Sequence, residues 1–199
     1  MFNYPNGKKF NNLNKIPNKK EINLKASYSA ANRGMNLEQS INISNDFYIE
    51  KNIALITKRP TPINVVKVDY TKGARIVDAY FEKQSTTDYN GLYKTRYVDF
   101  EAKSTKSKTS FPLANICKHQ IEHLKRVISL GGIAFFIIQF EIYNEVYLLD
   151  GSYIISFFEN GDRKSIPYSV IKEKGFLIKQ GYIPRLDYLE AVDKLYFAI

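Results

Sequence analysis

The chain has 199 residues, of which 44% are hydrophobic, and its 29 Lys and Arg residues exceed its 20 Asp and Glu residues, giving a formal net charge of +9. This length and apolar content fit one globular domain with a substantial core and argue against a second full domain. The excess lysine is spread along the chain. It favours a polyanionic partner, either nucleic acid or an acidic membrane surface, although a merely soluble basic protein fits the charge as well.

The compartment is indicated mainly by what the sequence lacks. Cys117 is the only cysteine, so no intramolecular disulfide can form and a reducing cytoplasm is the expected compartment. We expect its side chain to be a small buried hydrophobe. No apolar run approaches the roughly 20 residues of a membrane span, and the N-terminus lacks the apolar core of a signal peptide. The sequence therefore predicts a soluble, cytoplasmic protein without a membrane partner.

The first elements along the chain are an arm and a helix. Residues 1–30 mix Asn and Lys with isolated apolar residues, a composition that cannot bury enough surface to offset the entropy of folding. We expect a flexible basic arm here, followed by one domain over residues 31–199. A helix is predicted near the start of that domain, because Leu37, Ile41 and Tyr48 have a roughly helical spacing.

A hairpin is predicted next. A strand is expected over residues 53–57, and the two prolines that follow interrupt regular structure. Two runs rich in β-branched residues, 65–68 and 76–81, then flank Gly73, which suits a turn between paired strands. We therefore expect a β-hairpin inserted over about residues 59–81.

The remainder of the chain is predicted to alternate strands and helices. The expected elements are a strand ending at Lys103, a polar loop over 104–110, a helix over about 113–130 stopped by a glycine pair, strands over 133–138 and 145–149, a short helix over 153–158 and a last helix from Asp187. The predicted fold class is α/β, with a mixed central sheet flanked by helices.

The strand that ends at Lys103 carries an alternating pattern. Three apolar residues alternate with three charged ones, namely Val98, Phe100 and Ala102 with Asp99, Glu101 and Lys103. Successive side chains of a strand point to opposite faces. The pattern therefore predicts one buried face, with Glu101 and Lys103 side by side on the other.

A second carboxylate is expected beside this pair. Asp88 lies 13 residues before Glu101. Asn90 and Gly91, which lie between these two acids, suit the turn of a hairpin that would bring Asp88 next to Glu101. Two converging carboxylates repel unless a divalent cation lies between them, and hard oxygen ligands favour Mg²⁺, with Mn²⁺ as a substitute. Lys103 could then stabilise a developing phosphorane or help to activate water. By itself, an acid alternating with a lysine is more typical of an ordinary solvated face.

Around these residues the chain resembles the PD-(D/E)XK nuclease superfamily, and within it the RecU-type Holliday-junction resolvases of Gram-positive bacteria. The matching blocks are NRGM (32–35) with LE (37–38), KRPTP (58–62), STTDYNG (85–91), DFEAK (99–103), KTSFPL (108–113), HQIEH (119–123) and GYIPRLDY (181–188). The resemblance covers about residue 28 to the C-terminus. It implies a restriction-endonuclease-like fold in which the hairpin is a protruding stalk.

The resemblance also implies a function and a set of site residues. The implied activity is that of a magnesium-dependent endonuclease that cuts four-way DNA junctions as a homodimer, with recombination proteins as further candidate partners. Asp88 and Glu101 resemble the metal-binding carboxylates, Thr86 and Gln120 complete the metal environment, and Lys103 stabilises the transition state. Without the resemblance, Gln120 would be taken for an exposed amide on a helix surface, and Thr86 for a threonine favoured by strand propensity.

Basic residues predict the DNA-binding surface. A cluster on or beside the hairpin is expected to contact phosphates, and it consists of Lys58, Arg59, Lys67, Lys72 and Arg75. Lys106 and Lys108 follow the active strand and could grip the phosphates that flank the scissile bond. Arg33 could contact phosphate at the start of the first helix. Glu38 on that helix is an accessory carboxylate or an ordinary solvent-facing glutamate.

Alternatives stay open at this point. His119 and His123 share a helix face as a zinc pair would, but without a third nearby ligand of that type a helix-surface role is favoured. A non-catalytic protein that binds junctions and anneals strands could use the same scaffold. A repair or restriction nuclease that cuts duplex DNA is the other candidate. The intact Asp88, Glu101 and Lys103 favour a nuclease, and the stalk favours a junction as its substrate.

Overall fold

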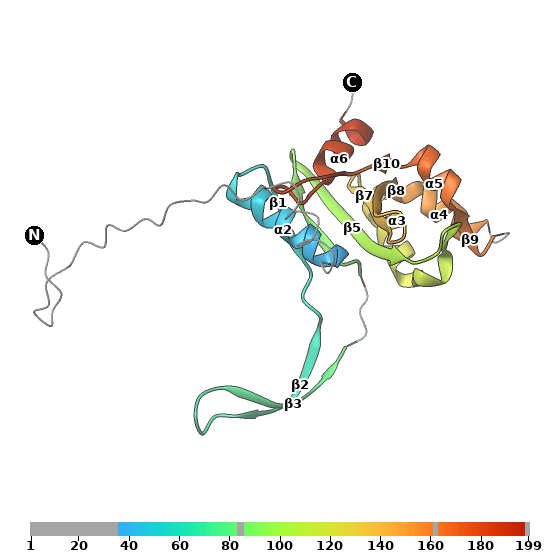
Figure 1. The fold of residues 1–199 in the computed structure, drawn as a ribbon. Helices are drawn as coiled ribbons and strands as arrows, with labels where there is room; N and C mark the ends of the chain where they lie inside the picture. The colour runs from blue at the N-terminus through green and yellow to red at the C-terminus, as the bar shows by residue number, and fades with distance from the viewer. Residues whose placement is uncertain (1–35, 83–85, 161–162, 198–199) are drawn as a thin grey trace, which may run out of the picture. The chain divides into compact units, whose positions relative to one another are not determined.

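The protein is seen in a computed structural model that describes residues 36–82, 86–160 and 163–197. The expected arm at residues 1–30 and Arg33 lie outside the described residues. A six-stranded sheet forms the centre of the domain (Figure 1), with neighbouring strands in the order β1 (Ala54–Lys58), β4 (Tyr89–Tyr93), β5 (Arg96–Thr105), β7 (Ile133–Phe140), β8 (Glu145–Asp150) and β10 (Phe176–Leu177). The sheet is mixed, because β5 and β7 pair in parallel while their other neighbours run antiparallel.

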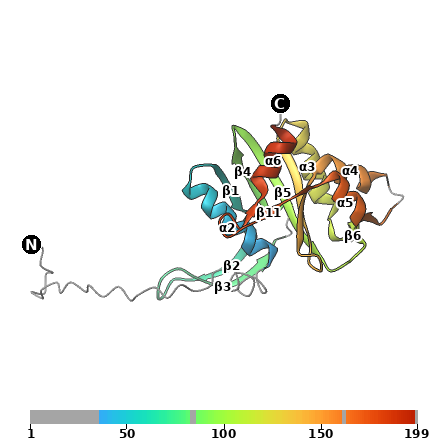
Figure 2. The same ribbon diagram turned by 45° about the horizontal axis from the view of Figure 1, so that its top comes forward.

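Helices cover both faces of this sheet (Figure 2). On one face lie α2 (Leu37–Glu50) and α6 (Tyr188–Tyr196), and on the other lie α3 (Lys118–Ser129), α4 (Gly151–Glu159) and α5 (Tyr168–Lys174). Alternate residues of β7 supply the two cores, so that Phe135 packs with α2 and α6 while Phe136 packs with α3 and α4. The predicted mixed sheet flanked by helices is confirmed. None of the described helices is both long and apolar enough to cross a membrane.

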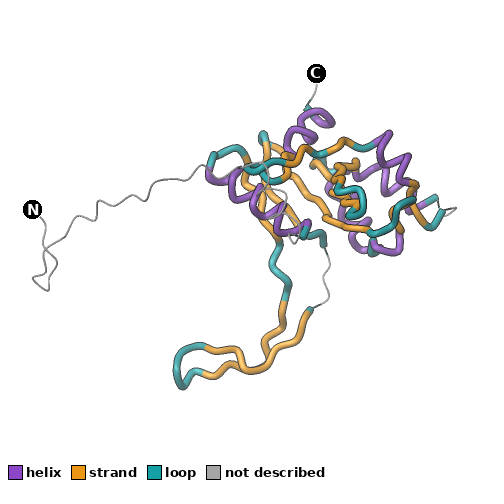
Figure 3. The backbone as a smooth tube through the Cα atoms, viewed as in Figure 1, coloured by secondary structure: helices purple, strands orange, loops and turns teal. Residues whose placement is uncertain are grey.

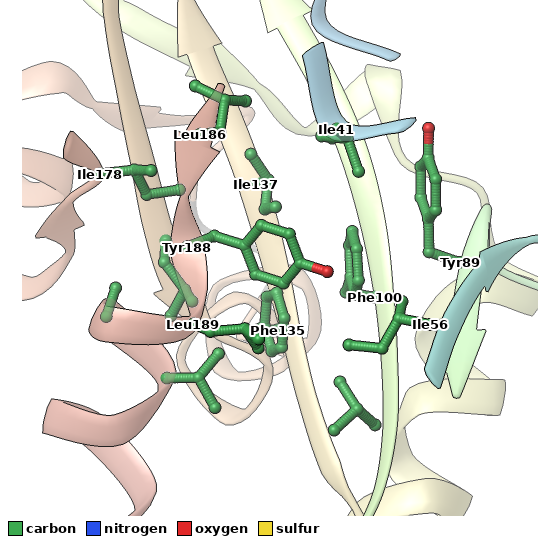
Figure 4. Packing of buried hydrophobic residues seen from close by; sticks show 14 of the residues in the cluster. Ile41, Ile56, Tyr89, Phe100, Phe135, Ile137, Ile178, Leu186, Tyr188 and Leu189 are labelled. Atoms are coloured by element: carbon green, nitrogen blue, oxygen red, sulfur yellow. The ribbon is translucent and has the colours of Figure 1, made fainter. Parts of the chain in front are cut away.

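A ladder of aromatic rings crosses the middle of the sheet on the α6 side (Figure 4). Tyr89, Phe100 and Phe135 are register partners on β4, β5 and β7. Their ring centroids are 4.9 Å and 4.7 Å apart, and neighbouring planes lie within 8° and 11° of parallel. Tyr188 of α6 packs on Phe100 at 5.4 Å. Cross-strand pairs of this kind stabilise one register, so the ladder holds β4 and β5 in a defined alignment.

The predicted hairpin is present as a separate two-stranded sheet (Figure 3). It consists of β2 (Ile63–Asp69) and β3 (Arg75–Phe81), which pair antiparallel with irregularities near Lys67. Gly73 lies in the connecting turn with φ +99°, a conformation that favours glycine. Every residue of β3 is exposed. The hairpin therefore contributes little to the core and offers its side chains to solvent.

The predicted turn at Asn90 and Gly91 is wrong. Both residues lie inside β4, and the chain reverses instead at Lys94 and Thr95, which have positive φ values of 44° and 66°. Gly91 is required for a different reason, because a β-carbon there would lie 1.9 Å from the carbonyl oxygen of Leu55 on β1. The glycine thus allows close strand packing rather than a turn.

Several short elements differ from the sequence predictions. The long helix expected over 113–130 is divided into a 3₁₀ turn, η1 (Leu113–Asn115), and α3. The polar loop is shorter than expected, because β5 runs to Thr105 and a strand begins at Ser110. That strand belongs to the first of two small sheets that were not predicted, β6 (Ser110–Pro112) with β9 (Ser165–Pro167) and β11 (Lys179–Gln180) with β12 (Leu186–Asp187). Strands of two or three residues depend on distant partners and carry almost no periodic signal.

The expectation that Cys117 is buried is also wrong. Cys117 is exposed, and it is the residue that precedes the first turn of α3. Its environment follows from the division of the predicted helix, because a residue at a helix start borders solvent more readily than one on the packed face of a continuous helix.

Replacing Gly91 with Ala should destabilise the domain by about 2 to 4 kcal/mol, because the added methyl group must push β1 away from β4. Urea unfolding of the full chain measures the change. Leu92→Ala is the matched control, since Leu92 is the next residue and is 51% exposed, and it should cost well under half as much. Equal stability of the Gly91→Ala and wild-type proteins would show that the close approach of the strands has no energetic weight.

Candidate active site on strand β5

The charged face of β5 is buried, which the alternating pattern did not predict. Asp99 and Glu101 are both 0% exposed, and α3 lies over this face. Ionised groups are rarely buried without partners, because loss of hydration is costly. The hydrogen-bond partners of these two carboxylates therefore define the site.

Asp88 and Glu101 lie together, as predicted. The backbone N–H of Asp88 donates to Glu101 Oε2 at 3.1 Å, and Asp88 Oδ2 accepts from the backbone N–H of Ala102 at 3.3 Å. The register of β4 against β5, in which Tyr89 faces Phe100, makes this possible. Asp88 is partly exposed, so the pair has one buried member and one that borders solvent.

The other oxygen of Glu101 has two partners. Lys103 Nζ lies 2.6 Å from Glu101 Oε1, and Gln120 Nε2 donates to the same oxygen at 2.6 Å. Gln120 is 4% exposed, so the residue-based expectation of an exposed amide is wrong. Its own Oε1 accepts from the backbone N–H of Cys117 at 3.0 Å, which fixes the side chain at the first turn of α3. The structure thus brings together Asp88, Glu101, Lys103 and Gln120.

The electrostatics of the pair suit a cation. Burial and, to a lesser degree, the negative charge of Asp88 raise the pKa of Glu101 to about 7, although the hydrogen bond and charge of Lys103 act to lower it. Among the described residues, no group of three or more His, Cys, Asp and Glu side chains is placed to hold a metal ion. A cation here would have two carboxylates as its charged ligands. Mg²⁺ commonly binds through one or two carboxylates and keeps several waters, so these residues fit it.

A second cluster, centred on Asp99, was missed by the sequence analysis. It comprises Thr87, whose Oγ1 donates to Asp99 Oδ1, and three groups around Asp99 Oδ2, namely Arg59 Nη2 at 2.6 Å, Tyr97 Oη at 2.8 Å and His123 Nε2 at 2.8 Å. Burial acts to raise the pKa of Asp99, but hydrogen bonds from His123, Thr87 and Tyr97 outweigh it and hold the pKa below its ordinary value. The signal that could have found this cluster is the position of Asp99 two residues before Glu101.

Two predicted site residues lie apart from these contacts. Thr86 lies in the bend before Asp88 and makes no hydrogen bond to another described residue, whereas its neighbour Thr87 is fully buried. Glu38 of α2 pairs with Lys58 at 2.5 Å, and both side chains are about half exposed. Tyr89, the residue after Asp88, donates its hydroxyl to the backbone carbonyl oxygen of Glu38 at 3.4 Å, so Glu38 lies on the Asp88 side of the site. Burial and the charges of Glu38 and Asp88 raise the pKa of Tyr89.

The predicted DNA-binding residues differ in their surroundings. Lys67, Lys72 and Arg75 are exposed on the hairpin, and Lys106 and Lys108 are exposed in the loop after β5. None of these five forms an ion pair within the described parts of the chain. Arg59 is different, because its guanidinium is engaged by Asp99 and its side chain is only 23% exposed.

The chain is similar to known recombination proteins and Holliday junction resolvases. The family model described as Recombination protein U, RecU, matches residues 32–194. The Holliday junction resolvase RecU of Bacillus cytotoxicus is 50% identical over 200 residues, and that of Bacillus thuringiensis is 52% identical, with 98% of each chain covered in both cases. Among solved structures, Hjc, a Holliday junction resolvase from the archaeal hyperthermophile Archaeoglobus fulgidus, matches with a TM-score of 0.38 and 12% identity, covering 69% of this chain and 94% of that one.

The family model spans most of the chain, and relatives that are half identical match it almost from end to end. The resemblance predicted from the sequence is therefore confirmed, and the chain belongs to the RecU family of recombination proteins.

Proposed function

We propose that this protein is an endonuclease that resolves Holliday junctions in DNA recombination and repair. The observation that carries the proposal is the convergence of Asp88, Glu101, Lys103 and Gln120 on one buried strand face, in a chain whose relatives are named Holliday junction resolvases. A non-catalytic junction-binding protein would have no need to hold two carboxylates together with one of them, Glu101, fully buried. A nuclease specific for linear duplex is disfavoured by the names of the relatives.

Asp88 and Glu101 are proposed to hold Mg²⁺, for which Mn²⁺ can substitute, with Gln120 and Thr86 at the margin of the site. When bound, the cation would neutralise charge on the scissile phosphate and lower the pKa of a bound water. Gln120 orients Glu101 by donating to one of its oxygens. Lys103, whose ammonium group lies at the same oxygen, supplies positive charge where negative charge develops in the transition state.

DNA contact is proposed for two groups of exposed basic residues, one on the hairpin that precedes β4 in the chain and one in the loop that follows β5. Lys67, Lys72 and Arg75 lie on the hairpin, and Lys106 and Lys108 follow β5 directly. Their charges are free of ion pairs with described residues, so they can neutralise phosphates without first breaking an internal contact. Such contacts provide affinity without reading sequence, which suits recognition of a junction by its shape.

The working unit is proposed to be a homodimer. A four-way junction has two-fold symmetry, and resolution needs two cuts at matching positions. A closed pair of subunits with one Asp88, Glu101 and Lys103 site each is the simplest object with that symmetry.

Removing the charge of any one catalytic residue should stop cleavage and spare binding. Asp88→Asn, Glu101→Gln and Lys103→Met each preserve side-chain size, and each should lower the cleavage rate by at least about 100-fold, because their charges serve the metal and the transition state. Junction affinity should stay within about twofold, since it comes from many phosphate contacts. The assay uses labelled four-way junction and linear duplex, with Mg²⁺ or with chelator. Wild-type cleavage rates in any one variant would refute that residue's role.

The raised pKa of Glu101 should make the metal-free protein less stable as pH rises. Between the ordinary value of 4.5 and about 7, the folded protein keeps a proton that the unfolded chain has released, so the free energy of unfolding falls with pH across this window. Glu101→Gln, which cannot ionise, should therefore be more stable than the wild type at pH 8 by about 1 to 3 kcal/mol, and nearly equal at pH 4.5. Thermal unfolding in chelator measures both proteins.

Adding Mg²⁺ provides the complementary measurement. It should raise the melting temperature of the wild type more at pH 8 than at pH 5.5, because only the ionised pair binds it well. If the difference in unfolding free energy between the metal-free wild type and Glu101→Gln did not change with pH, Glu101 would have an ordinary pKa.

Hairpin charges should act on binding. Replacing Lys72 and Arg75 together with Ala should weaken junction binding and reduce the slope of log affinity against log salt by about two, because two fewer phosphates are neutralised. Fluorescence anisotropy with a labelled junction at several salt concentrations measures the slope. Lys51→Ala, which removes an exposed lysine at the end of α2, is the control. An unchanged slope in the double variant would exclude the hairpin from DNA contact.

A further inference from the structure

We propose that Asp99 is a positioning residue, which holds the catalytic Asp88 in place and joins the catalytic strand to the base of the hairpin. The inference rests on the proposed nuclease function. Its starting point is that Asp99 is fully buried and that its carboxylate collects contacts from four different segments, namely the end of β1, the bend before β4, β5 itself and α3.

Two of these contacts hold Asp88 from both sides. Thr87, the residue before Asp88, is fully buried and donates its hydroxyl to Asp99. The backbone N–H of Arg59 donates to the carbonyl oxygen of Asp88 at 2.7 Å, while the Arg59 guanidinium binds Asp99 at 2.6 Å. The backbone of Asp88 is thus restrained through Thr87 and through Arg59, and both restraints end on the same carboxylate.

A third contact aligns α3 with the catalytic strand. His123 lies about one helical turn after Gln120, and its Nε2 is 2.8 Å from Asp99, while Gln120 donates to Glu101. Asp99 and Glu101 are two residues apart on one strand face, so they take two successive contacts from one helix. The His123 contact is thus a second polar restraint, beside that of Gln120, on the position of α3 over the catalytic strand.

The position of Arg59 extends this network to the hairpin. Arg59 directly precedes Pro60, where the chain leaves β1 toward β2. Its Nε is buried and has no hydrogen-bond partner within the described residues, and its side chain is 23% exposed. The guanidinium therefore points inward in this structure. It serves Asp99 rather than a DNA phosphate, in contrast to the role expected from its place beside the basic hairpin.

The two candidate roles of Arg59, positioning Asp88 and contacting a DNA phosphate, predict opposite effects of mutation on cleavage rate and on salt-dependent binding. If Arg59 positions Asp88, Arg59→Ala should lower the single-turnover cleavage rate at saturating junction by about 10-fold to 100-fold, with the salt slope of binding unchanged. Arg59→Lys, which keeps a charge near Asp99, should recover part of the rate. If Arg59 contacts phosphate, the salt slope should fall by about one, with a normal rate at saturation.

Two further variants test the network while keeping the ion pair between Asp99 and Arg59. Thr87→Val is nearly isosteric and His123→Gln keeps a donor, so we expect both to fold, whereas Asp99→Asn would leave the Arg59 guanidinium without its anionic partner. Thr87→Val should lower the saturated cleavage rate by about 10-fold, and His123→Gln by less. Lys51→Ala is the control and should match the wild type throughout.

Amide hydrogen exchange supplies a measurement that needs neither metal nor DNA. Peptides that cover residues 86–93 should exchange faster in Thr87→Val and Arg59→Ala than in wild type and Lys51→Ala, because Asp88 has lost a restraint. The proposal would be overturned if Thr87→Val and Arg59→Ala showed unchanged exchange and also cut junctions at the wild-type rate, both measured well below their melting temperatures. Asp99 would then be a purely structural residue. A wild-type protein that cuts no junction would refute the proposed function instead, and the exchange result would still decide whether Asp99 restrains Asp88.

Discussion

Two carboxylates, Asp99 and Glu101, are completely buried on one face of β5, and the surrounding structure is arranged to satisfy them. Each would be costly to bury alone. Asp99 is balanced by the guanidinium of Arg59 and by three further hydrogen-bonding groups, whereas Glu101 has a lysine and an amide on one oxygen and the negative charge of Asp88 close by. Both carboxylates have hydrogen-bond donors on each oxygen, but the pKa of Asp99 is held below its ordinary value, whereas burial and the charge of Asp88 raise the pKa of Glu101 to about 7. This difference supports the proposal that a cation binds at Glu101 and Asp88 rather than at Asp99.

The opposite face of the same strand explains how these groups are held. Phe100 lies between Asp99 and Glu101 in sequence and stacks between Tyr89 and Phe135 in the core (Figure 4). Because strand side chains alternate, a shift of one residue in register would expose Phe100 and put both carboxylates into an apolar core. The aromatic ladder and the buried charges therefore favour the same register. The geometry of the site is set by close packing behind it.

Basic residues that are neighbours in sequence do different work. Lys58 and Arg59 lie at the end of β1 and are paired with Glu38 and Asp99, while Lys72 and Arg75 are exposed on the hairpin without an ion pair among the described residues. Grouping them by proximity in the chain merges exposed charges, which are proposed to contact phosphates, with charges that are paired inside the domain. The boundary between the two groups falls at Pro60, where the chain leaves the central sheet.

The sequence by itself determined the fold class, the hairpin and the family, and it predicted that Asp88, Glu101 and Lys103 lie together, as they do in the structure. These rest on local signals: alternation on a strand, turn residues and motif blocks that can be read over a few positions. Only the tertiary structure decided where Asn90 and Gly91 lie, because the need for a glycine arose from the carbonyl of Leu55 on a strand far away in sequence. The tertiary structure likewise decided that Gln120 is buried and that Asp99 binds Arg59, Thr87 and His123. The physical reason is that a side chain's burial and partners depend on which distant segments pack against it, and no periodicity within one segment records that packing.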